Sequence, residues 1–180
     1  PPDALMPFGG FGAVESFMLK AARAACDFYL ENSASDGIPY WDTGAPGLSA
    51  LPGWRDRPAE PFNDHEPVDS SAAAVAAQGL MRLGHYLESR GDDGSRYRQA
   101  GLTLLKTLLS ERYLSLAPEH EGLLLHSVYH QPRGWDFIPP GRRIPCGESS
   151  MWGDYHLREA ALPVQRLADR GLYYTFFHAI

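Results

Sequence analysis

Apolar residues recur at the spacing of an amphipathic helix in several parts of this 180-residue chain. The pattern predicts helices over residues 14–32, from Asp69 to about Gly91, and over residues 95–111. In the first helix the expected apolar stripe is Met18, Ala21, Ala22, Ala25, Phe28 and Tyr29. In the third helix it is Tyr97, Gly101, Leu104, Leu105 and Leu108.

A fourth helix is predicted to begin near Ser149 or Ser150. Its expected inner face is Tyr155, Ala161, Val164 and Leu167. Pro163 lies inside this segment and should kink or break it, because proline lacks the backbone N–H that a helix needs.

The segments between these helices are long and rich in proline and glycine. Residues 1–12 read as an irregular lead-in, and residues 33–68 as a loop. Loops of that length are usually functional or disordered. Its aromatic residues favour a packed, functional loop: Tyr40, Trp41, Trp54 and Phe62. Residues 122–126 could form a short strand or an extended loop edge, followed by a loop over 131–146.

The order helix, long loop, helix, helix, long loop, helix indicates an all-α fold. Strands do not alternate with the helices, so a doubly wound α/β fold is not expected. Helical hairpins with long loops suit an α/α toroid or a helical solenoid, but no fixed repeat period is present. We therefore expect a single domain over residues 1–180, forming part of an α/α toroid whose long loops gather at one mouth.

Composition narrows the function classes. The net charge of −6 and the acidic pI argue against a nucleic-acid partner. No apolar run reaches the length of about 18 residues that a membrane helix needs, and no signal peptide is visible. Cys26 and Cys146 lie far apart, which argues against a disulfide framework and favours a cytoplasmic location.

The densest polar cluster lies at the start of the second predicted helix, where Asp69 precedes Ser70 and Ser71. An aspartate there is held ionised by the helix dipole and by backbone donors. The sequence alone supports both a simple N-cap and a ligand-binding carboxylate. Trp41 and Asp42 form a second candidate, because sugar sites pair an aromatic face with a carboxylate; Trp41 could equally anchor the core.

A third candidate lies at the predicted start of the last helix, where Glu148 is followed by Trp152, Asp154 and Tyr155. Trp152 could instead pack between helices, with Asp154 as a cap. His126 and His130 are four residues apart, but their segment does not read as helical and no third ligand is indicated. We therefore expect no metal site.

Several of these motifs resemble glycoside hydrolase family 88, the unsaturated glucuronyl hydrolases. The resemblance spans roughly residues 15–162 and rests on four stretches in the family's order: Trp41-Asp42, Asp69 to Ala77 with Gly79-Leu80, Gly122 to His126, and Trp152 to Tyr155 with Glu159-Ala160. One local departure is Glu148-Ser149, where family members usually carry Asp-Ser.

The resemblance implies an (α/α)6 toroid of six helical hairpins and a hydrolase that needs no cofactor. Such enzymes remove a 4,5-unsaturated uronic acid from the non-reducing end of oligosaccharides by hydrating its double bond. It implies substrate-binding roles for these residues: Trp41, Asp42, Asp69, Ser70, His126, Trp152, Asp154 and Tyr155. The family's two catalytic aspartates have no match in this chain, which resembles the carboxy-terminal half, so the catalytic residues stay unassigned.

Two other interpretations remain open. The chain could be a non-catalytic helical module that binds a sugar or a partner chain. It could also be an ordinary acid/base glycosidase using Asp69 with Asp154 or Glu148, although no spacing in the sequence fixes their separation. In either case so few helices cannot close a ring of six hairpins, and the open edge would expose apolar helix faces, so we expect a homo-oligomer or a missing amino-terminal half.

Overall fold

The structure, a computed structural model, describes residues 2–173. It contains four α-helices: α1 (Gly10–Glu31), α2 (Ser70–Ser89), α3 (Ser95–Leu108) and α4 (Met151–Ala168). Four short 3-10 helices accompany them: η1 (Pro2–Phe8), η2 (Pro46–Ala50), η3 (Trp54–Asp56) and η4 (Gln131–Arg133). Within 2–173 there is no strand, only isolated bridges between Tyr40 and Val68 and between Leu114 and Leu124. The all-α class is confirmed.

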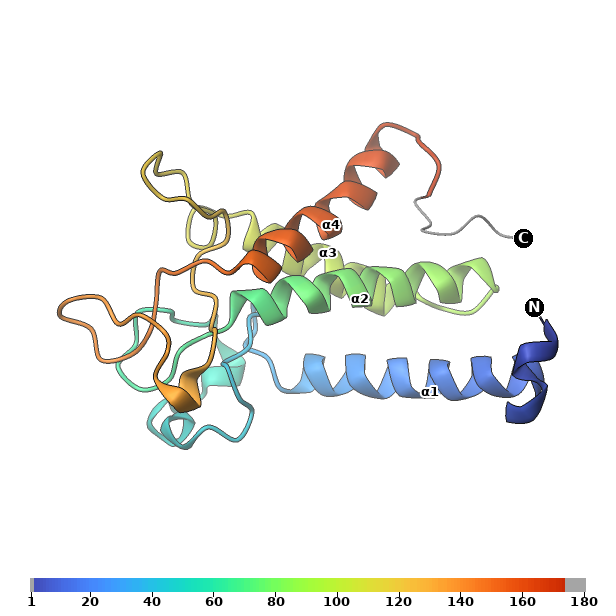
Figure 1. The fold of residues 1–180 in the computed structure, drawn as a ribbon, viewed down its shortest axis with the longest axis horizontal. Coiled ribbons are helices and arrows are strands. Elements are labelled where there is room, and N and C mark those ends of the chain that lie inside the picture. The colour runs from blue at the N-terminus through green and yellow to red at the C-terminus, as the bar shows by residue number, and fades with distance from the viewer. Residues whose placement is uncertain (1, 174–180) are drawn as a thin grey trace.

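The four helices run back and forth, so that both long loops lie at the same end of the molecule (Figure 1). The chain leaves α1 and α3 at this end and enters α2 and α4 there. We call this end, made by residues 32–69 and 109–150, the mouth. The predicted gathering of long loops at one mouth is thereby confirmed.

Helix α2 is the centre of the fold and packs against both α3 and α4. Its buried face is rich in small residues, which include Ala73, Ala74 and Ala77. A Cβ atom built on Gly84 would lie 2.7 Å from the backbone nitrogen of Arg98. The backbones of α2 and α3 therefore approach so closely that only glycine fits at this position. The predicted apolar face of α3 is fully buried, although the helix ends at Leu108 instead of residue 111.

The loop over residues 33–68 is packed, as its aromatic content predicted. Ile38, Tyr40 and Trp54 are buried. The rings of Tyr40 and Trp54 meet edge to face, with centroids 5.4 Å apart. This packing gives the mouth a fixed scaffold, because buried aromatic pairs add to the energy of area burial.

Helix α1 differs from the prediction in two ways. It begins at Gly10 instead of residue 14, after η1 and a left-handed Gly9. The glycines that read as breakers therefore supply this junction, since glycine adopts a positive φ without strain. The expected stripe is right for Ala22 and Tyr29, which pack on the core, and wrong for Met18 and Phe28, which are more than half exposed. The residues that pack on the core are Leu19, Ala22, Cys26, Tyr29 and Leu30.

Helix α4 passes through Pro163 and continues to Ala168, so the predicted break does not occur. Its predicted inner face is wrong for Tyr155 and Leu167, which are exposed. The residues that face the core are Gly153, Leu157, Ala160 and the half-buried Val164. Two of these core-facing residues, Gly153 and Ala160, are small because α4 lies close to α2 at this face.

The segment over residues 122–126 is an extended loop edge and not a strand. Across 2–173, no helix combines the length and the apolar character that crossing a membrane requires. The end of the tail, residues 174–180, lies outside the described residues.

Candidate functional site

A chain of hydrogen bonds joins the start of α4 to the start of α2 at the mouth. The indole Nε1 of Trp152 donates to Ser71 Oγ at 3.1 Å. Ser71 Oγ in turn donates to Asp69 Oδ1 at 2.6 Å. Two residues predicted to share a sugar site, Asp69 and Trp152, are therefore brought together across 83 positions of sequence by a serine. That serine was not among the predicted ligands.

Asp69 is the N-cap of α2, as the sequence indicated. Its Oδ1 accepts the backbone N–H groups of Ser71 at 3.0 Å and Ala72 at 3.3 Å. It also accepts the N–H of Val128 at 3.3 Å, which ties the second long loop to α2. Burial raises the pKa of this carboxyl, while the hydrogen bonds from Ser71, Ala72 and Val128 act in the opposite direction. The hydrogen bonds recorded for the carboxylate all end on Oδ1.

A groove of about 570 Å³ adjoins this pair. Asp69, Ser71 and Trp152 lie at its mouth end, and mostly apolar residues of α1 and α2, Tyr29 and Leu80 among them, form the rest of its lining. One carboxylate beside an indole on an otherwise apolar surface suits a ligand that is part hydroxyl and part C–H, as a sugar is.

Ser70 turns away from this groove. Its Oγ donates to the carbonyl of Leu125 at 2.6 Å and lies 3.4 Å from Ser127 Oγ, and its side chain is fully buried. Gly153 follows Trp152, and a Cβ there would come within 2.9 Å of Ser127 Oγ. Ser70 and Gly153 therefore fix how closely the loop, α2 and α4 approach one another.

Trp41 and Asp42 lie in the first long loop. Trp41 Nε1 donates to Glu66 Oε2 at 2.6 Å, and the other carboxylate oxygen of Glu66 accepts the N–H of Gly47 at 2.7 Å. Glu66 is buried, so it holds the loop together from inside. Asp42 is exposed and accepts the N–H of Gly44 at 2.6 Å. Trp41 is half-buried and Asp42 is exposed. Neither observation tests their predicted contact with a sugar, which stays a prediction.

His126 is buried at 3% exposure, with both ring nitrogens engaged. Its Nδ1 accepts the N–H of Gly147 at 2.9 Å, so the proton lies on Nε2, which donates to the carbonyl of Arg112 at 3.2 Å. The rings of Phe62 and Tyr113 meet the imidazole edge to face. Its backbone is left-handed, with φ at 68°. This arrangement makes His126 a cross-link between loops, and any substrate contact by it stays a prediction.

The burial of His126 should make stability depend on pH. Desolvation lowers its pKa from 6.5 to about 4, helped by the charge of Arg112 and opposed by Glu60 and the backbone bond to Arg112. Between these values the unfolded chain binds a proton that the folded chain does not, so stability is full above pH 6.5 and falls as the pH falls. We expect a loss of about 2 kcal/mol from this group between pH 7 and pH 5.

Urea unfolding of the wild type and of His126→Asn at both pH values measures this effect. Asparagine tolerates the left-handed backbone and does not titrate, so the variant is less stable overall but loses less on acidification. Equal losses in the two proteins would contradict the assignment.

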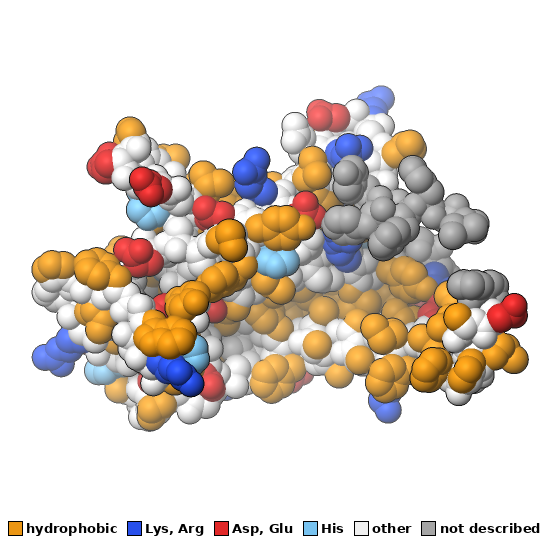
Figure 2. Space-filling model, viewed as in Figure 1, with side chains coloured by type: hydrophobic (Ala, Val, Ile, Leu, Met, Phe, Trp, Pro, Cys, Tyr) orange, Lys and Arg blue, Asp and Glu red, His pale blue; other side chains and the backbone are white. Residues whose placement is uncertain are grey.

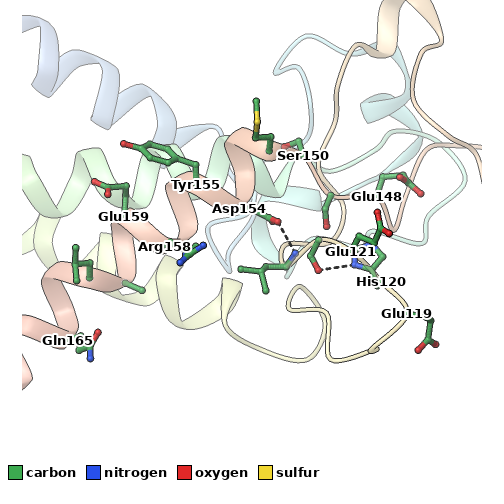
Figure 3. Close-up of a pocket in the computed structure, with 16 residues that line it drawn as sticks. Glu119, His120, Glu121, Glu148, Ser150, Asp154, Tyr155, Arg158, Glu159 and Gln165 are labelled. Atoms are coloured by element: carbon green, nitrogen blue, oxygen red, sulfur yellow. Dashed lines mark hydrogen bonds between the residues drawn. The ribbon is translucent and has the colours of Figure 1, made fainter.

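Asp154 and Tyr155 lie on the other side of α4, in a cavity of about 1380 Å³ between that helix and residues 119–123. Figure 3 shows Asp154 pointing at the loop, where its carboxylate oxygens accept the N–H groups of Leu123 at 2.9 Å and Leu124 at 2.8 Å. Asp154 is therefore a brace for the loop. Tyr155 lines the open cavity beside Arg158 and Glu159. The structure thus separates Asp154 and Tyr155 from the groove of Asp69 and Trp152.

Two aromatic residues at the mouth were missed by the sequence reasoning. Tyr129 lies 5.3 Å from Trp152 between ring centroids, and Trp135 lies 5.7 Å from Tyr129. Trp135 is in the proline- and glycine-rich loop predicted over residues 131–146, and Tyr129 lies two residues before that loop; their aromatic side chains were the available signal. Among residues 2–173, no three His, Cys, Asp or Glu side chains gather as a metal site.

Comparison with known proteins gives a consistent result. No family model matches the sequence. The chain is 30% identical to the unsaturated glucuronyl hydrolase of Formosa agariphila over 152 residues, which cover 83% of this chain and 31% of that protein. It is 27% identical to the unsaturated chondroitin disaccharide hydrolase of Streptococcus agalactiae, over 78% of this chain and 29% of the relative.

Comparison of the fold with solved structures finds the same enzymes. The crystal structure of unsaturated glucuronyl hydrolase from Bacillus sp. GL1 superposes with a TM-score of 0.60 at 29% identity. The match covers 82% of this chain and 33% of that one. The helices and the loops at the mouth thus form part of an α/α toroid of the glycoside hydrolase type. By sequence and fold, the chain is a homologue of the unsaturated glucuronyl hydrolases, glycoside hydrolase family 88, and spans about a third of their length.

Proposed function

We propose that this chain is the sugar-binding wall of a hydrolase that removes 4,5-unsaturated uronic acids from the non-reducing ends of oligosaccharides. The observation that carries the proposal is the hydrogen-bonded chain from Trp152 through Ser71 to Asp69. It sets an indole and a carboxylate side by side at the mouth, in a chain whose homologues are unsaturated glucuronyl hydrolases. Trp152 would stack on the sugar, and Asp69 Oδ2 would accept a bond from a hydroxyl.

The reaction that fits this class is hydration of a vinyl ether. A carboxylic acid protonates the double bond of the uronate, and a water molecule adds to the carbon next to the ring oxygen. The resulting hemiketal opens and releases the remaining saccharide. The acid serves as both proton donor and base for the water, so the spacing of a carboxylate pair has no bearing on the outcome.

We further propose that the proton donor lies outside this chain. Asp154 has both carboxylate oxygens engaged by backbone N–H groups of the loop, which assigns it to bracing that loop. Asp69 caps α2 through Oδ1 and is assigned to binding, although its raised pKa keeps a direct acid role testable. An ordinary glycosidase would need two free carboxyl groups, and this engagement of Asp154 argues against its serving as one.

The surface of α1 supports the proposal that this chain is only part of the enzyme. Beyond the side that packs on the core, it carries exposed apolar residues: Phe11, Phe17, Met18 and Phe28. Figure 2 shows such side chains gathered along the lower rim of the molecule, over α1 and η1. A helix that is apolar on both sides is normally packed between two layers. We infer that helical hairpins of an amino-terminal half cover this surface.

We also infer a cytoplasmic location. Cys26 and Cys146 are free thiols in the structure. Free cysteines that pack as apolar residues suit a reducing compartment.

The test is the absorbance of the unsaturated uronate, which disappears when its double bond is hydrated. The 180-residue chain should leave the signal of an unsaturated disaccharide unchanged, whereas the chain extended by the reading frame upstream of Pro1 should remove it. Turnover by the 180-residue chain alone would refute the proposal that the proton donor lies outside it.

Binding of the disaccharide without turnover by the extended protein would favour the interpretation of this chain as a non-catalytic binding module. Light scattering reports whether the chain self-associates through α1 instead.

A further inference from the structure

Three aromatic rings form a stepped row at the mouth. Tyr129 lies between Trp135 and Trp152, with centroid separations of 5.7 Å and 5.3 Å and ring planes inclined by 30° and 33°. Two of the rings come from the second long loop and one from the first turn of α4. The row therefore continues outward from the groove that holds Asp69 and Ser71.

The two outer rings of this row are open to solvent, and Trp152 is half-buried. Tyr129 is 59% exposed and Trp135 is 56% exposed. Large apolar side chains that cluster on a surface commonly mark a binding site. Single exposed aromatic residues need no such explanation, but three adjoining rings beside a carboxylate do.

The rings are held in place before any ligand arrives. The carboxylate of Asp136 accepts the backbone N–H groups of Tyr129 and His130, which fixes the loop beneath the row. The guanidinium of Arg133 lies 5.4 Å from the centre of the Trp135 ring. Trp152 is fixed by its bond to Ser71. Preorganised rings lose little conformational entropy on binding, which favours affinity.

The chemistry of the row suits a pyranose ring. Aromatic faces carry partial negative charge and attract weakly positive C–H groups, which one face of a sugar presents. Sugar hydroxyls need acceptors nearby, and Asp69 provides one at the inner end of the row. A purely apolar partner would leave that carboxylate without a hydrogen-bond donor from the ligand, at a cost.

We propose that Trp152, Tyr129 and Trp135 form an aromatic platform for saccharide units beyond the unsaturated terminal residue. This proposal rests on the proposed function for the identity of the terminal sugar, and it concerns the part of the oligosaccharide that is released. Longer oligosaccharides then bind more tightly than disaccharides, because only they reach the outer rings.

Trp135 offers a matched pair of variants. Trp135→Phe keeps a flat aromatic face, whereas Trp135→Leu keeps an apolar side chain without one. Tryptophan fluorescence or calorimetry with a lyase-generated chondroitin tetrasaccharide and disaccharide measures affinity in the 180-residue chain. We expect Trp135→Leu to weaken tetrasaccharide binding about tenfold and to leave the disaccharide unchanged. Trp135→Phe should stay within about threefold of the wild type.

Equal affinities of the wild type and Trp135→Leu for the tetrasaccharide would overturn the platform. Absence of binding of either saccharide at millimolar concentration would overturn it as well. In the extended protein, hydration with an unchanged KM for the tetrasaccharide in Trp135→Leu would refute the platform and leave the proposed function standing. Tighter binding of the longer oligosaccharide without any hydration would refute the proposed function and leave the platform standing.

Discussion

Gly84→Leu is expected to abolish the packing of α3 on α2 and to lower the free energy of unfolding by about 4 kcal/mol or more. A Cβ at this position would lie 2.7 Å from the nitrogen of Arg98 and 2.8 Å from the carbonyl oxygen of Gly94. Both obstacles are backbone atoms, so a rotamer change cannot relieve the contact. Circular dichroism during urea unfolding measures the loss.

The same helix contains its own control. Gly79 is exposed, and a Cβ there meets nothing within 4 Å. Gly79→Leu should therefore raise stability by up to about 1 kcal/mol, because leucine is the better helix former. Similar destabilisation by both substitutions would mean that helix α2 tolerates no change, and the close approach at Gly84 would not be the cause.

Asp69→Ala is expected to cost about 3 kcal/mol. It removes the N-cap of α2 and leaves the N–H of Val128 without its acceptor, and each loss is worth about 1–2 kcal/mol. It also removes the acceptor that holds the Ser71 hydroxyl, so the partner of the Trp152 indole is no longer fixed in position. Thermal unfolding gives the stability, and a change in the summed fluorescence of the four tryptophans reports the altered environment of Trp152.

Asp69→Asn is the matched variant, since its amide oxygen can accept the bonds that end on Oδ1. It should retain most of the stability and weaken oligosaccharide binding, because the charge that attracts sugar hydroxyls is gone. In the extended protein, complete loss of turnover by a well-folded Asp69→Asn would show that Asp69 is a proton donor and not a binding residue.

Local signals predicted a large part of the fold. The start of α2 at Asp69 and of α4 at Ser150 followed from capping residues, and the buried face of α3 followed from its period. The stripes of α1 and α4 could not be predicted in the same way. Both helices carry apolar residues on more than one side, and periodicity alone does not say which side meets the core.

In the candidate site, too, local features could be predicted from the sequence and long-range contacts could not. Asp69 and Trp152 were recognisable as polar and aromatic residues at helix starts. Their connection through Ser71 was not, because the hydrogen bond spans residues 71 and 152 and depends on how closely α4 approaches α2. Asp154 and His126 were predicted as substrate contacts, which stays untested; their engagement with backbone groups could not be predicted, because only the folded loops create it.

The sequence by itself determined the helices, their caps, the two long loops and the resemblance to family 88, because these depend on neighbouring residues and on ordered motifs. Tertiary structure alone decided which apolar faces are buried, which polar groups satisfy the backbone, and which aromatic rings meet at the mouth. The physical reason is that burial and hydrogen-bond partnership are properties of pairs distant in the chain. Here a close approach of glycine- and alanine-rich helices sets those pairs.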